Sequence, residues 1–271
     1  MSAARFAVIG QPVSHSKSPR IHAAFARECG VDIEYTAIEV APKELANQLA
    51  TLHADGYVGL NVTLPHKAAA VALCAGVSER AQLAGAVNCL IRSDDGWRGD
   101  NTDGEGLLRD LSRLGLVVAG ARVLVLGAGG AARGIVGPLL AAAPASLTVS
   151  GRNPWKPEEL AEQFKPVGTV IPRTHLALKG DAYDLIINAT SAGHDGGVPR
   201  LPPGLLAAGG ACYDLSYGAA FEPFAAWARA QGASVVADGL GMLVEQAAAS
   251  FTLWLGPAPD AEAVLATLRA G

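Results

Sequence analysis

The chain has 271 residues, of which 50% are hydrophobic, and a formal net charge of −4. This weakly acidic composition, without a basic patch or tail, argues against a nucleic-acid partner, and no apolar stretch predicts a membrane span. The four cysteines form no Cys-x-x-Cys pair, and a strand begins near Arg5 with no signal peptide before it, so we expect a cytoplasmic protein with free thiols and no metal site.

The first hundred residues alternate between strand and helix patterns. Strands are predicted over Phe6–Ile9, Glu34–Val40, Tyr57–Val62 and Ala86–Arg92. Between the strands, one helical face carries Ile21, Phe25 and Cys29, and another carries Leu45, Leu49 and Leu52. This alternation predicts a parallel sheet with right-handed crossovers.

Two serines stand in the loop after the first strand. Ser16 and Ser18 flank Lys17 just before a predicted helix. At this spacing both hydroxyls can donate to one carboxylate, and the helix N-terminus adds its dipole. Ordinary helix capping, with Ser18 as the N-cap and Pro19 in the first turn, accounts for the same residues. The spacing alone leaves both interpretations open.

Polar residues also follow the later strands of this unit. Thr63 and Lys67 come after the third strand, and Asp103 opens a helix a few residues after the fourth. Because ligands bind beyond the carboxyl ends of the strands in open α/β sheets, a lysine and an aspartate placed there form a plausible acid–base couple. A surface salt bridge is the alternative that composition leaves open.

A strand, a glycine-rich turn and a helix follow one another from Val123 onward. The apolar run Val123–Leu126 precedes the segment Gly127-Ala128-Gly129-Gly130-Ala131-Ala132. In this context Gly127 permits the tight turn, Gly129 lets a pyrophosphate approach the backbone, and the helix N-terminus attracts the anion. The pattern predicts a dinucleotide-binding site, with a plain tight turn as the alternative.

The end of the next strand predicts which dinucleotide binds. After the strand Ser146–Ser150 the chain reads Gly151-Arg152-Asn153, with no carboxylate where an NAD site carries Asp or Glu. A carboxylate would repel a phosphate on the ribose, whereas Arg152 can hold it with a planar fork of donors. The sequence therefore favours NADP, and a solvated arginine in a loop is the alternative.

The remainder of the chain continues the alternation. Strands are predicted over Val167–Ile171, Leu185–Asn188, Ala211–Leu215 and Ser234–Ala237. Two helices follow, one from about Leu240 to Trp254 and one after a good cap at Asp260. The chain therefore divides into two α/β units near residue 103.

Seven segments together resemble the shikimate dehydrogenase family along essentially the whole chain. They are Ser16–Pro19, Asn61–Lys67, Gly85–Asn88, Gly99–Gly104, Gly127–Ala131, Asn188–Ser191 and Asp238–Gln246. The resemblance implies a reversible, NADPH-dependent reduction of 3-dehydroshikimate to shikimate in the biosynthesis of chorismate and the aromatic amino acids. It also implies an α/β fold of two domains with the active site in the cleft between them. These are a substrate domain over residues 1–103 plus 239–271, and a Rossmann-like NADP-binding domain over residues 104–238.

The resemblance further implies roles for single residues. Lys67 and Asp103 would form the catalytic pair. The residues that would contact the substrate are Ser16, Ser18, Thr63, Lys67, Asn88, Asp103, Tyr217 and Gln246. Those that would contact NADP are Gly127, Ala128, Gly129, Gly130, Ala131, Arg152, Leu215 and Gly239.

Two other functions stay open at this point. One is an NAD-preferring quinate dehydrogenase, against which Ser18 argues, because relatives that accept quinate tend to carry Thr there. The other is a non-catalytic dinucleotide-binding sensor, which would normally have lost the lysine–aspartate couple, whereas Lys67 and Asp103 are both present. We expect a small-molecule substrate and a monomer or homodimer.

Overall fold

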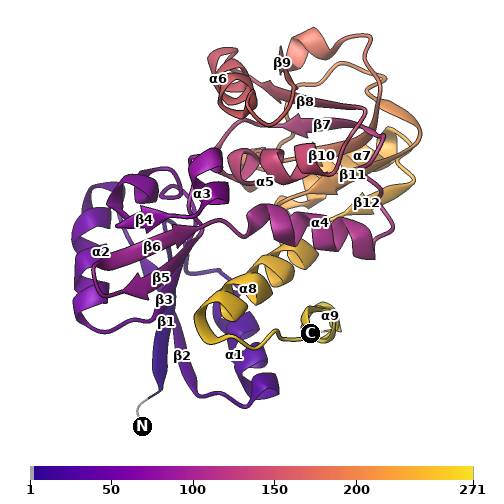
Figure 1. Cartoon of the computed structure of the whole chain (residues 1–271). Coiled ribbons are helices and arrows are strands. Elements are labelled where there is room, and N and C mark those ends of the chain that lie inside the picture. Colours follow the sequence, from indigo (N-terminus) through magenta and orange to yellow (C-terminus); the bar gives the residue numbers. More distant parts are fainter. Residues whose placement is uncertain (1–2, 271) are drawn as a thin grey trace. The chain divides into compact units, whose positions relative to one another are not determined.

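The structure, a computed structural model, describes residues 3–270 and divides into two compact units (Figure 1). One unit comprises Met1–Leu107 with Leu243–Gly271, and the other comprises Leu108–Met242. Each division lies four residues after the boundary expected from the sequence, inside a helix: α4 (Asp103–Arg113) and α8 (Leu240–Leu255) both contain a boundary. The α/β fold class expected from the sequence is confirmed.

The first unit is built on a six-stranded sheet in the order β2-β1-β3-β5-β6-β4. Its strands are β1 (Ala4–Gly10), β2 (Ile33–Glu39), β3 (Gly59–Val62), β4 (Gly76–Val77), β5 (Cys89–Ser93) and β6 (Gly96–Asp100). Its complete helices are α1 (Ser18–Cys29), α2 (Leu45–Ala54), α3 (Glu79–Ala84) and α9 (Ala261–Ala270). Because β2 and β3 lie on opposite sides of β1, the loops that follow β1 and β3 meet where the strand order reverses, which is where α/β sheets bind ligands.

This sheet differs from the prediction in one respect: it is mixed rather than parallel. Strands β1, β2 and β3 run parallel, but β5 pairs antiparallel with both β3 and β6. The reason is a tight turn at Asp94-Asp95, where Ser93 pairs with Gly96, whose φ is +132°. The turn folds β5 and β6 into a hairpin, so no helix crosses over between them.

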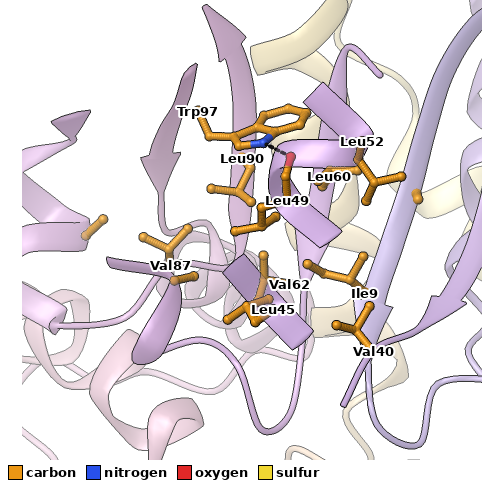
Figure 2. Packing of buried hydrophobic residues seen from close by; sticks show 13 residues of the cluster. Ile9, Val40, Leu45, Leu49, Leu52, Leu60, Val62, Val87, Leu90 and Trp97 are labelled. Atoms are coloured by element: carbon orange, nitrogen blue, oxygen red, sulfur yellow. Dashed lines mark hydrogen bonds between the residues drawn. The ribbon is translucent and has the colours of Figure 1, made fainter. Parts of the chain in front are cut away.

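The core of the first unit lies between the sheet and α2 (Figure 2). The helix contributes Leu45, Leu49 and Leu52, which the sequence placed on one face, and all are buried. Trp97 of β6 covers one end of this core and donates its indole N–H to the Leu49 carbonyl at 2.9 Å. The packed face fixes β1 and β3, whose last residues carry the loops of the candidate site.

The second unit contains a fully parallel sheet in the order β12-β11-β10-β7-β8-β9. The strands are β7 (Arg122–Leu126), β8 (Ser146–Gly151), β9 (Val170–Thr174), β10 (Tyr183–Asn188), β11 (Leu206–Asp214) and β12 (Val235–Ala237). The helices are α5 (Gly130–Ala141), α6 (Trp155–Phe164) and α7 (Glu222–Ala230). This is the strand order of dinucleotide-binding sheets, and it reverses between β7 and β10.

The C-terminal helices follow the expected signals. Helix α9 begins after Asp260, whose carboxylate accepts a hydrogen bond from the Ala263 amide at 3.0 Å as an N-cap. It packs beside α1 in the first unit (Figure 1). The four cysteines are free thiols, two of them buried and two half-buried. Over residues 3–270, no helix has the length and apolar character needed to span a membrane.

Candidate active site

The loops after β1 and β3 are joined at the switch point of the first sheet. Gln11 donates its backbone N–H to the Leu64 carbonyl at 2.8 Å, and Thr63 donates to the Ile9 carbonyl at 2.9 Å. A Cβ added at Gly10 would lie 2.4 Å from the Thr63 side chain, so only glycine permits this approach. The contact holds Thr63 beside the end of β1.

The two serines hydrogen-bond to each other, and Ser16 Oγ also accepts from the Ser18 backbone N–H at 3.2 Å. Helix α1 begins at Ser18 itself, with Lys17 in the N-cap position, and the Lys17 side chain makes no capping hydrogen bond. The Ser16 hydroxyl donates to Ser18 Oγ at 3.2 Å, and Ser18 is 3% exposed. The interpretation of Ser18 as an N-cap is therefore wrong, because its hydroxyl lies within the first turn. Both hydroxyls are placed together, as binding of one carboxylate requires.

Lys67 and Asp103 form an ion pair, with Nζ 2.6 Å from Oδ2. The side chains are 17% and 5% exposed, so the alternative of a surface salt bridge is wrong. Asp103 is the first residue of α4, as predicted, and the positive end of the helix dipole stabilises its charge there. Desolvation strengthens a charge-assisted hydrogen bond of this kind, which fixes the ammonium relative to the carboxylate.

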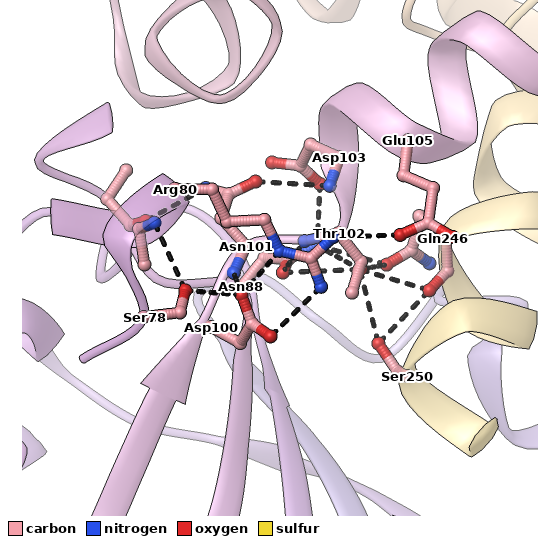
Figure 3. Close-up of polar contacts among 12 residues, drawn as sticks. Ser78, Arg80, Asn88, Asp100, Asn101, Thr102, Asp103, Glu105, Gln246 and Ser250 are labelled. Atoms are coloured by element: carbon pink, nitrogen blue, oxygen red, sulfur yellow. Dashed lines mark hydrogen bonds and ion pairs between the residues drawn. The ribbon is translucent and has the colours of Figure 1, made fainter. Parts of the chain in front are cut away.

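Asn88 connects three parts of the site (Figure 3). Its Nδ2 lies 2.8 Å from Asp103 Oδ1, 2.9 Å from Thr102 Oγ1 and 3.2 Å from Gln246 Oε1. Its Oδ1 accepts from the Thr102 backbone N–H at 2.8 Å. The Asn88 amide therefore fixes the aspartate of the ion pair and connects it to Gln246 of α8.

Three polar residues of this network were given no role by the sequence reasoning. They are Asn61, Thr102 and Ser250, which are 5%, 0% and 0% exposed. Ser250 Oγ lies 3.0 Å from Asn61 Nδ2 and 3.2 Å from Thr102 Oγ1. Ser250 follows Gln246 by one helical turn of α8, and this spacing on one face is the signal that could have identified it.

A second ion pair fixes the segment that carries Asp103. Arg80 of α3 contacts both carboxylate oxygens of Asp100, at 2.6 Å and 2.9 Å, and reaches Glu105 at 2.8 Å (Figure 3). Burial alone would raise the pKa of Asp100, but donation from Arg80 and Ser78 lowers it below its usual value. The clamp holds β6 where it passes into α4, and so positions the catalytic candidate that follows.

The glycine loop of the second unit lies at the switch point between β7 and β10. Gly127 has φ +102°, and a Cβ there would lie 2.9 Å from the Ala189 carbonyl oxygen. No atom lies within 4 Å of a Cβ built on Gly129, and α5 begins at Gly130 without a side-chain cap. The first amides of α5 therefore remain available as donors to a ligand. These residues fit a dinucleotide pyrophosphate.

Arg152 follows β8 at the end where a ribose phosphate would bind. It is exposed, like its neighbours Asn153 and Lys156, and the segment between them contains no acidic residue. His175, which follows β9, contacts Ser150 at 3.0 Å. Burial lowers the pKa of His175, and the nearby Arg152 lowers it further. Arg152 and Lys156 thus place two exposed positive charges after β8, which suits a phosphate.

The other predicted cofactor residues meet after β11. Gly239 approaches Leu215 so closely that a Cβ would lie 2.2 Å from the Leu215 carbonyl oxygen. Tyr217 lies half-buried in the same loop of the second unit. Asp214, at the end of β11, accepts from Ser216 N at 2.8 Å and Asn188 Nδ2 at 3.0 Å, and burial raises its pKa to about 6. The sequence places Asp214 after a strand, beside Tyr217, but assigns this carboxylate no role.

The first unit thus combines a proton donor, a carboxylate that orients it, paired hydroxyls and buried amides. Such a set can bind a small anionic polyol and move a proton at one oxygen. Among residues 3–270, no group of three or more His, Cys, Asp or Glu side chains could hold a metal ion.

Comparison with known proteins extends over the whole chain. The family model of the shikimate dehydrogenase substrate-binding domain matches residues 8–90, that of shikimate/quinate 5-dehydrogenase matches 111–195, and that of the shikimate 5′-dehydrogenase C-terminal domain matches 239–269. The NADP(+) shikimate dehydrogenase of Aeromonas hydrophila is 49% identical over 98% of this chain and 97% of its own length. That of Xanthomonas campestris is 50% identical over 100% and 97%.

The chain belongs to the shikimate dehydrogenase family. Among solved structures, the shikimate 5-dehydrogenase of Thermus thermophilus in complex with NADP(H) and shikimate has a TM-score of 0.85 and 34% identity, covering 98% of this chain and 99% of that one. The family resemblance read from the seven sequence segments is therefore confirmed.

Proposed function

We propose that the chain catalyses the reversible, NADPH-dependent reduction of 3-dehydroshikimate to shikimate in the biosynthesis of chorismate and the aromatic amino acids. The observation that carries the proposal is the largely buried Lys67–Asp103 pair, held at 2.6 Å and braced by Asn88. Homologues of about 50% identity along the full length carry this activity in their names. The protein is accordingly an NADP-dependent oxidoreductase.

The substrate carboxylate would bind at Ser16 and Ser18, whose hydroxyls lie together at the start of α1. The ring hydroxyls would contact Thr63, Asn88, Gln246 and the ion pair; the substrate contact expected of Tyr217 stays a prediction. A polyhydroxylated anion offers little apolar surface, so affinity must come from hydrogen bonds to each group. A site lined by hydroxyls, amides and one ion pair has the corresponding chemistry.

Lys67 would transfer the proton to and from the substrate oxygen. When bound, NADPH supplies a hydride to the ring carbonyl carbon. The Lys67 ammonium donates to the carbonyl oxygen and transfers a proton to it as negative charge develops, which yields the alcohol. Asp103 accepts the hydrogen bond that aims Nζ, and Asn88 keeps the carboxylate from rotating away. In the reverse direction, neutral Lys67 accepts the proton from the hydroxyl.

The second unit would hold NADP. The backbone of Gly127 to Ala131 would bind the pyrophosphate at the open N-terminus of α5, and Leu215 and Gly239 would line the nicotinamide end. Arg152 would bind the ribose phosphate through its guanidinium N–H groups. We place the enzyme in the cytoplasm, which supplies NADPH and keeps thiols reduced, as a monomer or homodimer.

A spectrophotometric assay at the nicotinamide absorbance tests the proposal by crossing shikimate and quinate with NADP and NAD. We expect shikimate with NADP to have the highest kcat/KM of the four pairs. Faster turnover of quinate with NAD would instead identify a quinate dehydrogenase. Tight NADP binding without turnover of any pair would identify a sensor.

A further inference from the structure

The indole of Trp155 is exposed to water in the segment that carries the proposed phosphate site, and nothing above gives it a role. Its side chain is 71% exposed, whereas every other tryptophan, tyrosine and phenylalanine of residues 3–270 is buried or half-buried. Burying an aromatic ring is among the larger contributions that one side chain makes to stability, and the folded chain gives up that contribution here. A large apolar side chain left exposed beside a ligand site is a candidate contact for an apolar part of the ligand.

Trp155 lies within reach of the same ligand as Arg152. Both residues belong to the short link between the end of β8 at Gly151 and the first turn of α6, and both are exposed. Three residues apart, their Cα atoms can be separated by no more than about 10 Å. Arginine and tryptophan are long side chains, so from that separation they can contact one nucleotide together.

The first turn of α6 is fixed with Trp155 on its outer side. The Trp155 backbone N–H donates to Asn153 Oδ1 at 3.0 Å, which closes the turn that leads into the helix. Pro157 is buried, and a Cβ built on Gly151 would lie 3.2 Å from Pro157 Cγ, so the helix start packs against the end of β8. The exposed indole therefore extends from a backbone that is held in place.

Helix α6 is also held against α5, whose N-terminus is the proposed pyrophosphate site. Arg133, in the first turn of α5, donates to Gln163 of α6 and lies 3.4 Å from the Glu159 carboxylate. The Arg133 side chain is only 18% exposed. The helix that begins with Trp155 is thus fixed relative to the helix that would bind the pyrophosphate.

NADP contains an apolar group that fits an exposed indole at this place. Its extra phosphate and its adenine are attached to neighbouring carbons of one ribose, so a phosphate held by Arg152 brings the adenine to the same link. Adenine has two flat π-faces, and stacking of a base on an aromatic ring needs no hydrogen-bond partner. Trp155 is the only aromatic residue between Gly151 and Leu160.

We propose that Trp155 binds the adenine of NADP by stacking on it, beside the phosphate that Arg152 holds. This inference rests on the proposed function, in which NADP binds to the second unit. Adenine is common to NADP and NAD, whereas the extra phosphate is not. Trp155 therefore contributes to the affinity for both dinucleotides, and Arg152 determines the preference between them.

Titration with 2′,5′-ADP tests the inference without turnover, because this ligand carries the adenine and the ribose phosphate but no nicotinamide. Adenine stacked on the exposed indole should quench the red edge of the tryptophan fluorescence, and inorganic phosphate, which has no base, should leave it unchanged. Trp155→Phe should lose this quench and keep the Kd within about threefold of the parent, since a phenyl ring still stacks. Trp155→Ala should lose the quench and raise the Kd about 5- to 30-fold, as loss of one base–aromatic stack implies.

Trp227→Phe is the matched control for the fluorescence. Trp227 is half-buried in α7 and stacks on Phe224 with ring centroids 5.3 Å apart. Helix α7 packs on β11 and β12, which lie on the other side of β7 from β8 in the sheet. This variant should therefore keep both the quench and the Kd of the parent protein.

Dinucleotide affinities, measured by calorimetry, separate this inference from the phosphate assignment. Trp155→Ala should raise the Kd of NADP and of NAD by the same factor, whereas Arg152→Ala should raise that of NADP alone. A quench that persists in Trp155→Phe, or a Kd of 2′,5′-ADP in Trp155→Ala within about twofold of the parent, would overturn the inference. A dimer that dissociates in Trp155→Ala while this Kd stays unchanged would also overturn it, and would identify the indole as a contact between copies. Failure of the parent protein to oxidise shikimate would refute the proposed function, while the quench by 2′,5′-ADP would still decide the role of Trp155.

Discussion

Lys67→Ala is the substitution with the largest predicted effect on catalysis. It removes the ammonium that lies 2.6 Å from Asp103 Oδ2 and leaves that carboxylate its hydrogen bond from Asn88 at 2.8 Å. The Lys67 ammonium makes its hydrogen bond to Asp103, so the substitution removes no hydrogen bond of the serine loop or the glycine loop. The substitution therefore tests proton transfer while the residues proposed to bind the cofactor stay unchanged.

The size of the effect follows from the role assigned to Lys67. A positioned general acid contributes roughly 10²- to 10⁴-fold to the rate, so kcat should fall by about 10³-fold, or about 4 kcal/mol of transition-state stabilisation. Asp103 is 5% exposed on its side chain, and leaving it without its cation should lower the free energy of unfolding by about 1–3 kcal/mol. For a chain of this size that corresponds to a fall in Tm of very roughly 2–10 °C.

Steady-state kinetics at the nicotinamide absorbance measure the loss of kcat, and calorimetry measures the affinity for NADP. The NADP affinity should be unchanged, because the cofactor loop belongs to the other unit. Lys43→Ala is the matched control, since it removes the same charge from an exposed position of the first unit. A Lys67→Ala variant that keeps kcat within about threefold of the parent would refute the acid–base assignment, given the 10²-fold minimum expected of such a group.

Three other predictions concern the second unit. Arg152→Ala should raise the KM of NADP by about 10- to 100-fold, as loss of a charged hydrogen bond implies, and leave that of NAD nearly unchanged. Gly129→Ala should abolish NADP binding without loss of stability, because the added Cβ would meet no protein atom but would enter the space for the phosphates. Gly127→Ala should instead destabilise the fold, because its Cβ would lie 2.9 Å from the Ala189 carbonyl oxygen and its φ is +102°. Burial raises the pKa of Asp214 to about 6. The folded chain therefore keeps the Asp214 proton at a pH where the unfolded chain has lost it. As a result, the free energy of unfolding should rise by up to about 3 kcal/mol as the pH falls from about 7 to about 4. Asp214→Asn should remove that rise in urea titrations.

Each of these has a result that would contradict it. Lys165→Ala, an exposed change at the end of α6, is the control for Arg152→Ala, and equal losses for NADP and NAD would contradict the phosphate assignment. NADP binding that survives in Gly129→Ala would exclude the glycine loop as the pyrophosphate site. A pH dependence of stability that is the same in Asp214→Asn as in the parent would mean that another group carries it.

Single strands, turns and helices could be predicted because the residues that determine each of them are close together in the sequence. The run Val123–Leu126 is completely buried, as a continuous apolar strand should be, and the glycine segment after it forms the predicted turn into α5. The hairpin of β5 and β6 was missed, although Asp94-Asp95-Gly96 carries its turn signal. Alternating apolar and polar residues, with helices before and after them, do not determine whether a strand pairs parallel or antiparallel with its neighbours.

The contacts of the candidate site could not be predicted in this way. Asn88 was singled out by resemblance, but its partners lie 14, 15 and 158 residues away along the chain. The clamp from Arg80 to Asp100 likewise depends on how α3 packs against β6. No periodicity encodes such pairings, so residues that act by orienting others become visible only in the fold.

A crystal structure of the chain with shikimate bound tests the central claim most directly, namely that the polar network of the first unit is the substrate site. We expect the carboxylate to lie between the Ser16 and Ser18 hydroxyls, with a ring hydroxyl within hydrogen-bonding distance of Lys67 Nζ and Asp103. Shikimate bound with its carboxylate away from the serines, or with its ring out of reach of Lys67, would contradict it.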